Sequence, residues 1–400
     1  MSKVKVIAII AFLMFVTNQV NAQKEPNFNP LRSGIPSLSI TPDARAGSMG
    51  DIGVATESDV FSQYWNPAKY AFAFSKAGIG LTLTPWLSSL VDDVFLTYVS
   101  GFYKIGDSDN IAIGSSFRYF SLGEIALTQY DAGSPDQYKD AGSTRPYELA
   151  FDASIALKFT QAYSQAVAFR YIFSDLGTTI RSQEGLLPAN AVAVDIAGFY
   201  NKYIMLGRSE CLLGLGYNIS NIGTKVSYDN GENSTFLPTN LRIGASLLYP
   251  LDDYNTIAIN ADVNKYLIPT PPVKKVGMTP EEEAIYNDAK RVYDATTPIS
   301  GIFKSFSDAP GGFKEELQEI AWSVGAEYAY DNKFFVRGGY FYENPNKGNR
   351  QYFGLGAGFR MTALQLDVAY LISANSTNPL DKTWRFSLSF DMDGLRNLMR

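Results

Sequence analysis

The sequence predicts an all-β protein, a transmembrane outer-membrane β-barrel of about 14 antiparallel strands with an N-terminal plug inside it. Three observations predict this fold. The chain begins with an export signal, residues 76–391 alternate between apolar and polar side chains, and the connections between the alternating segments are short and long in turn. Short turns on one side and longer loops on the other are typical of outer-membrane barrels.

Residues 1–22 have the features of a secretory signal peptide. Lys3 and Lys5 precede an apolar run from Val6 to Val16, and Ala22 ends a stretch that suits signal cleavage. We therefore expect the mature protein to begin near Gln23, outside the cytoplasm.

Composition excludes several classes of protein. Beyond residue 22 there is no apolar run of the roughly 18 residues that a membrane-spanning helix needs. Hydrophobic residues nevertheless make up 46% of the chain, and charged residues only 18%, which suits a barrel that faces lipid. The net charge of −6 disfavours nucleic acid as a partner.

The sequence contains no histidine, the commonest general base and metal ligand. Cys211 is the single cysteine, so it cannot form a disulfide within the chain. We expect no catalytic residue, no cofactor and no metal, and therefore no enzymatic activity.

Strand polarity can be read from the alternation. Trp384, Phe386, Leu388 and Phe390 share one face of the last segment, and Arg385, Ser387 and Ser389 share the other. The same period places Leu366 and Leu388 toward lipid, and Asp367 and Ser389 toward the lumen. The fourteen predicted segments are 76–84, 92–104, 110–130, 146–160, 163–182, 191–204, 209–228, 236–250, 253–266, 320–331, 333–343, 350–361, 363–374 and 382–391.

The strands of a soluble β-sandwich would also alternate between apolar and polar residues. The length of the segments and the pattern of turns therefore decide between a sandwich and a membrane barrel. Most segments reach the roughly 9 to 11 residues that cross a bilayer on a tilt. An even number of strands returns both termini to the periplasm, which predicts a multi-pass protein with periplasmic termini.

Trp86, Trp322 and Trp384 lie beside long connections, where they form either an interfacial girdle or ordinary core. Gly123 interrupts the third segment and indicates a bulge or a kink.

The chain divides into a signal peptide (1–22), an N-terminal segment (23–75), the barrel (76–391) and a periplasmic tail (392–400). Residues 23–75 are too polar to face lipid. A lumen of about 14 strands is too wide for its wall side chains to fill, so this segment is expected inside it as a plug. The alternative is a disordered periplasmic tail.

The connection 267–319 is far longer than a barrel needs, and long structured loops are usually functional. Thr279-Pro280-Glu281-Glu282 predicts a capping box and a helix through Tyr293, and residues 312–320 predict a second helix. The loop is either a protein-docking surface or packs on the barrel rim. Its candidate docking residues are Tyr286, Tyr293, Phe303, Phe306, Phe313 and Leu317, with Val292 and Ile302 beside them.

Two runs in the N-terminal segment carry a resemblance. Asp43-Ala44-Arg45-Ala46-Gly47-Ser48-Met49-Gly50 is followed by Tyr64-Trp65-Asn66-Pro67-Ala68. This pattern resembles the FadL-type barrel superfamily and, within it, the PorV (LptO) family of the Bacteroidota type IX secretion system. The residues of this plug motif are Arg45, Gly47, Gly50, Trp65, Asn66, Pro67 and Ala68. Their role is either packing alone or contact with a ligand.

The resemblance implies a non-enzymatic secretion component. Its partners would be a SprA-type translocon, the C-terminal domains of secreted cargo and a PorU-type sortase or attachment complex, with outer-membrane lipid or lipopolysaccharide around the barrel. The same superfamily implies an alternative, a FadL-type channel for hydrophobic small molecules. The chain departs from many barrels because Phe390 is followed by ten more residues, so Phe390 itself is the candidate assembly signal.

Overall fold

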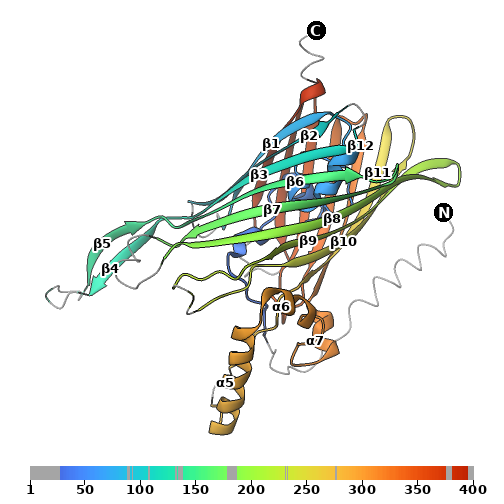
Figure 1. Ribbon diagram of the computed structural model, residues 1–400. Coiled ribbons are helices and arrows are strands. Elements are labelled where there is room, and N and C mark those ends of the chain that lie inside the picture. The colour runs from blue at the N-terminus through green and yellow to red at the C-terminus, as the bar shows by residue number, and fades with distance from the viewer. Residues whose placement is uncertain are drawn as a thin grey trace.

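The computed structural model describes residues 28–87, 91, 93–106, 109–130, 133, 138–177, 187–229, 231, 233–274, 277–374 and 381–394. The predicted signal peptide and the tail beyond residue 394 lie outside these residues. Fourteen antiparallel strands close into a barrel, which confirms the predicted fold class (Figure 1). Closure is made by β1 and β16, where Leu81 pairs with Leu388.

The barrel strands follow the chain in order, apart from one hairpin that leaves the wall. Their bounds are β1 Ala77–Pro85, β2 Val94–Ile105, β3 Ile111–Leu122, β6 Tyr147–Lys158, β7 Tyr163–Asp175, β8 Ala189–Leu206, β9 Ser209–Gly223, β10 Asn240–Pro250, β11 Asn255–Tyr266, β12 Ile320–Tyr330, β13 Phe334–Tyr342, β14 Gln351–Arg360, β15 Leu364–Ser373 and β16 Trp384–Asp391.

The two faces of the wall have opposite chemistry. Leu366 is 46% exposed on the outer face, whereas its neighbour Asp367 is 2% exposed on the inner face. The same holds around the barrel, where Val336 and Phe353 are exposed outward. Apolar side chains outside and polar ones inside are the reverse of a soluble barrel, and they suit a wall surrounded by lipid.

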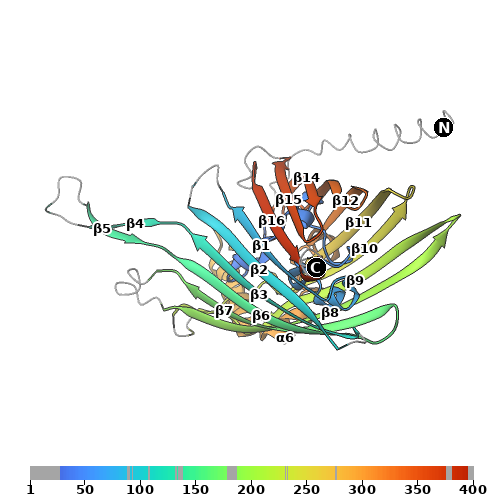
Figure 2. The same ribbon diagram turned by 90° about the horizontal axis from the view of Figure 1, so that it is seen from above.

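The predicted third segment, 110–130, is two elements. Gly123 has a φ of +83°, a left-handed conformation in which glycine has no steric penalty, and the chain turns out of the wall there. β4 Ile125–Tyr130 and β5 Tyr138–Thr144 then form a separate two-stranded sheet that projects beyond the barrel (Figure 2). Gly123 therefore ends a strand and is not a bulge within one.

The described part of the N-terminal segment, residues 28–75, runs through the barrel. It carries short helices: η1 Pro36–Ser39, α2 Ala44–Ser48, α3 Ser62–Trp65 and η2 Pro67–Phe72. The Asn29 amide donates to Asn346 in a long connection, and the Lys76 amide donates to Asp393 beyond the last strand. We call residues 28–75 the lumen segment, because they pass from the mouth with the long loops to the mouth with the short turns.

The path of the lumen segment determines at which mouth of the barrel each described end of the chain lies. The first described residues lie at the long-loop end, and Gly394 lies at the short-turn end (Figure 1). The two described ends are therefore at opposite mouths of the barrel, unlike the arrangement expected from an even number of strands alone. The even number still places the start of β1 and the end of β16 at one mouth.

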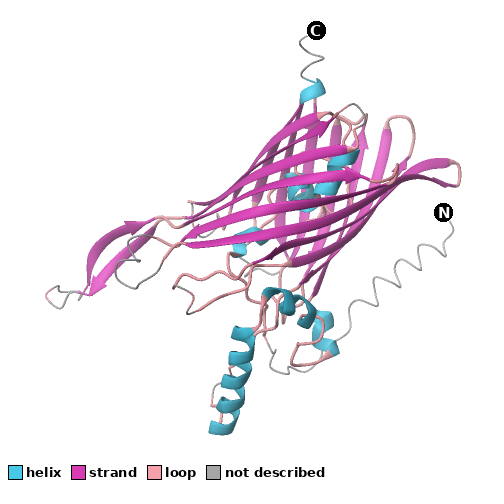
Figure 3. Cartoon of the chain, in the orientation of Figure 1, coloured by secondary structure: helices cyan, strands magenta, loops and turns pink. Residues whose placement is uncertain are grey.

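The described part of the long loop contains three helices: α5 Pro280–Ala295, α6 Pro298–Lys304 and α7 Phe313–Gln318. The predicted capping box is confirmed, since Thr279 and Glu282 each accept from the other's backbone amide. α6 was not predicted; it begins at a second Thr-Pro pair, Thr297 and Pro298. α5 stands away from the barrel (Figure 3). Within the described ranges, no helix has the length and apolarity to span a membrane.

The assigned faces can be tested with nitroxide labels. In a Cys211→Ala background, single cysteines at positions 366 and 389 would carry the label, because Leu366 faces outward and Ser389 faces the lumen side. We expect oxygen, which concentrates in lipid, to relax the label at position 366 several times faster than at 389. Equal relaxation at both positions would contradict the register.

Candidate functional site

Helix α2 packs so closely on the inner wall that its backbone lies against the backbone of the strands. A Cβ at Gly339 of β13 would stand 2.0 Å from the Met49 carbonyl oxygen, and one at Gly354 of β14 would stand 2.4 Å from that of Gly47. Gly50, with a φ of +81°, lies on the backbone of β13. Glycines on the polar face of these strands therefore leave room for the lumen segment.

A chain of alternating charges joins the lumen segment to the wall. Arg45 donates to both carboxylate oxygens of Glu327 on β12, at 3.0 and 2.9 Å, and to Asp59 at 3.0 Å. Arg337 of β13 contacts the same Glu327 and donates to Asp367 at 2.6 Å. We call these five residues the charge chain. Each cation contacts two carboxylates, which offsets the cost of burying them.

Trp65 is an anchor within the lumen. Its indole Nε1 donates to Asp43 at 2.6 Å, and its ring meets Tyr64 edge to face at 4.9 Å. Asp43 also accepts from the Ala46 amide, which caps α2. One carboxylate therefore connects α2 to α3, although Asp43 and Trp65 lie 22 positions apart in the sequence.

The Asn-Pro corner fixes the path of the chain after Trp65. The Asn66 side chain donates to the Val54 and Gly198 carbonyl oxygens, both at 3.0 Å, and accepts from the Ala68 amide at 3.1 Å. Pro67 occupies the first turn of η2, where its missing N–H costs nothing. The plug-motif residues therefore meet within one buried cluster or contact the wall beside it.

A recess of about 610 Å³ opens above the lumen segment at the long-loop end. One side is apolar, formed by Ile40, Trp86, Val94 and Phe120. Trp86 packs on this inner cluster, which is the core alternative of its two predicted places, whereas Trp322 and Trp384 lie on the outer face. The other side is charged, with Glu319, Glu343, Lys347, Arg350 and Arg385 among its lining residues.

The candidate docking residues of the long loop differ in exposure. Phe303, Phe306, Phe313 and Leu317 are each more than half exposed. Tyr286 and Tyr293 are half-buried: the Tyr293 ring meets Phe236 at 5.5 Å, and the Lys274 ammonium lies 5.9 Å from the Tyr286 ring centroid. The exposed members of this set therefore belong to α6, to α7 and to the segment between them, while on α5 the apolar side chains of Ile285 and Val292 are exposed as well.

The end of the long loop is fixed to the rim. Glu319 accepts from Lys265 at 2.7 Å and from Lys347 at 3.0 Å, which links the loop to β11 and to the β13–β14 connection. Asp308 accepts from the amide and the hydroxyl of Thr270 at 3.1 and 3.2 Å. Sequence reasoning missed these residues, because isolated charges far apart in the chain carry no spacing signal. α5, in contrast, has no buried residue.

The described residues contain no group of three cysteine or carboxylate side chains placed to hold a metal ion. Cys211 is buried and free. Polar groups of the described lumen join the lumen segment to the wall, as Arg45 does with Glu327, or pair strands of the wall with one another, as Arg170 does with Asp152 and Asp195.

Comparison with known proteins gives a family and a set of similar barrels. The family model described as "Type IX secretion system protein PorV" matches residues 22–273. The solved P. putida toluene transporter TodX is 11% identical, with 87% of this chain and 97% of that chain covered and a TM-score of 0.48. A Pseudomonas aeruginosa FadL homologue is 11% identical, covering 91% of this chain and 99% of that chain, with a TM-score of 0.43. No curated protein matches the chain.

The charge chain predicts the effect of one substitution. Glu327→Gln leaves Arg45 and Arg337 facing a neutral amide, and breaking a buried ionic contact costs roughly 3–5 kcal/mol. We expect the denaturant midpoint of the detergent-solubilised barrel to fall accordingly. Glu124→Gln is the matched control, since Glu124 pairs with Arg145 on the exposed β4–β5 hairpin and should leave the midpoint unchanged. Equal midpoints for the two variants would contradict this role.

The loop-to-rim contact predicts a pH dependence. Burial, together with Glu316 and Glu319, raises the pKa of Asp308 to about 6. The folded loop therefore binds this proton more tightly than the unfolded loop does. The resulting stability is fully present below about pH 4 and is lost as the pH rises through about 6. A nitroxide at Lys314 should be less mobile at about pH 5 than at about pH 8. Asp308→Asn should abolish the difference, and a difference that persists would exclude Asp308 as its source.

Proposed function

Because the chain belongs to the PorV family of the type IX secretion system, we propose that it acts by binding proteins at the long-loop mouth of its barrel. Proteins of this family are outer-membrane components of the secretion system. The proposed partners are a SprA-type translocon and the C-terminal domains of cargo, which the protein delivers to a PorU-type sortase without catalysing a reaction. The observation that carries the proposal is an open, amphipathic recess above a lumen segment that packs on the wall.

The recess suits a segment of protein. Its apolar wall offers burial to side chains, and the opposite wall offers charged donors and acceptors to backbone groups. Arg350 is already oriented by Glu343 through two contacts, at 2.9 and 2.7 Å, so this wall is ordered before a partner arrives. An ordered site loses less conformational entropy on binding.

The long loop adds a second surface beside the recess. Phe303, Phe306 and Phe313 expose aromatic rings next to the rim contacts that hold the loop in place. Aromatic residues are enriched at the energetic centres of protein interfaces. Rim packing and docking are therefore compatible. Contacts within residues 308–319 fix the end of the loop to the rim, while exposed side chains of α5 to α7 stay available to a partner.

A FadL-type channel for hydrophobic small molecules is the alternative, and the apolar half of the recess favours it. Such a channel would need a path onward from the recess. α2 occupies the lumen between the wall glycines and the charge chain, and we expect it to obstruct a path along the barrel axis. Uptake of a labelled fatty acid by proteoliposomes distinguishes the two functions, since only the channel supports it.

We place the long-loop mouth outside the cell and the short turns in the periplasm, as in other outer-membrane barrels. The described C-terminal end would then be periplasmic. The lumen segment would reach the outer mouth at residue 28.

Replacing residues 279–296 with a short Gly/Ser linker tests the docking role of α5. The rim contacts of Asp308 and Glu319 remain in this variant, so the barrel should keep its resistance to heat in detergent. We expect co-purification with the translocon from mild detergent to fall, and secretion of cargo to fall with it. Replacing the tip of the β4–β5 hairpin, residues 131–137, is the control. Survival of both activities without α5 would mean that the docking surface lies elsewhere.

A further inference from the structure

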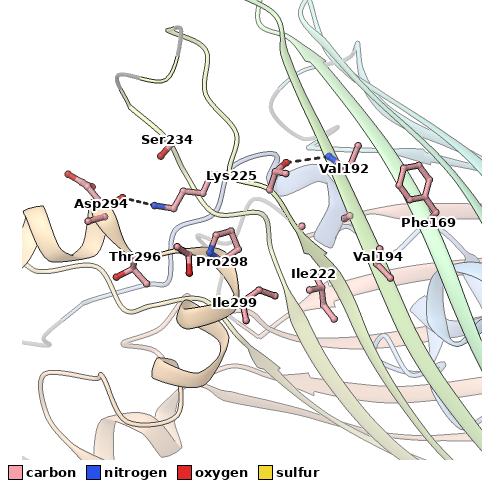
Figure 4. Close-up of a pocket in the computed structure, with 15 residues that line it drawn as sticks. Phe169, Val192, Val194, Ile222, Lys225, Ser234, Asp294, Thr296, Pro298 and Ile299 are labelled. Atoms are coloured by element: carbon pink, nitrogen blue, oxygen red, sulfur yellow. Dashed lines mark hydrogen bonds between the residues drawn. The ribbon is translucent and has the colours of Figure 1, made fainter.

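An apolar groove of about 640 Å³ lies on the outer surface of the barrel, between the wall and the long loop. Pairing of β8 with β9 shifts register between Val194 and Ile196 and ends at Gly223. The chain then leaves the wall through Thr224, and α6 packs over β9. The groove occupies the space left where the chain departs from the wall (Figure 4).

The inner wall of this outer groove is continuous with the lipid-facing surface. Phe169, Val192 and Val194 line it, and all three belong to the outward set of β7 and β8 that is exposed along the strands. Ile299 of α6 closes the opposite side and is itself 57% exposed. In a membrane, these side chains adjoin acyl chains, so the occupant nearest to the groove is a lipid.

The end of the groove away from the strands is polar. Among the described residues that line it, Lys225 carries the one positive charge. Its ammonium donates to the Asp294 carbonyl at 2.7 Å, which uses one of three donors. The Asp294 carboxylate attracts Lys225 electrostatically, but its ion pair is with Lys290 of the same helix. Burial also lowers the pKa of Lys225, as expected of an ammonium group that has lost water.

We propose that the outer groove binds one glycerophospholipid, with an acyl chain along Phe169, Val194 and Ile299 and the phosphate at Lys225. The volume lies within the roughly 300–1,000 Å³ of small-molecule sites. One cation matches one phosphate. Lipid A, with several acyl chains and a phosphorylated disaccharide, would need a larger groove and more positive charge. The bound lipid would join the wall to α6 and so support the loop that carries the proposed docking surface.

The test uses the full chain in nanodiscs of phosphatidylethanolamine and phosphatidylglycerol, extracted into mild detergent and analysed by native mass spectrometry. We expect about one phospholipid to remain on each chain. Ile299→Trp should fill the groove and reduce retention roughly tenfold. Lys225→Gln should reduce it roughly fivefold, as expected for one lysine near a membrane surface. Ile285→Trp, on the exposed face of α5 and outside the groove, should retain the lipid.

Equal retention by the wild-type chain, Ile299→Trp and Lys225→Gln would overturn the proposal, because the lipid would then be bound nonspecifically. Retention of lipid A in preference to phospholipid, in nanodiscs that contain both, would also overturn it. Heat resistance in detergent shows whether each variant is folded, and Lys225→Gln supplies the test if the Trp substitution fails to fold. The lipid count is independent of translocon binding, so this result and that of the docking experiment can fail separately.

Discussion

The structure depends on the burial of charged groups in pairs inside the barrel. The wall encloses more space than its own side chains fill, and its inner face carries carboxylates that are costly to bury alone. Arg45 of the lumen segment and Arg337 of the wall share Glu327, and Asp59 and Asp367 complete the charge chain. The lumen segment thus supplies positive charge that compensates carboxylates of the wall, and contacts with the wall fix the course of the lumen segment through the barrel.

This arrangement gives the two mouths of the barrel different properties. Near the middle, glycines on β13 and β14 bring α2 onto the wall, so backbone as well as side chains of the lumen segment occupies part of the interior. At the long-loop mouth, the lumen segment does not fill the interior of the barrel, and a recess with one apolar and one charged wall remains there. The chain belongs to the PorV family of the type IX secretion system, and the exposed rings of the long loop lie at the same mouth as this recess.

Much of the fold could be predicted from the sequence, because the strand period, the alternation of short and long connections and the capping box at Thr279 are local patterns. The exit of the chain at Gly123 was missed, since the apolar alternation continues past it into β4. For Trp86 the sequence leaves both a girdle place and a core place open, because periodicity at a strand end does not say which way the next side chain turns. The motif residues Arg45 and Trp65 were identified by resemblance, but their partners Glu327 and Asp43 depend on tertiary contacts that no spacing reveals. The rim contacts of Lys265, Glu319 and Lys347 depend on such contacts as well.

We propose that the lumen segment closes the barrel, so that the protein acts by binding at its mouth and not by conduction. Ion conductance of single barrels in a planar bilayer tests it most directly. The intact chain should give no steady conductance, and a chain that lacks residues 28–75 should form open pores if it folds, as its resistance to heat in detergent would show. Steady conductance of the intact chain would contradict the claim, and so would a folded, deleted chain that conducts no better than the intact one.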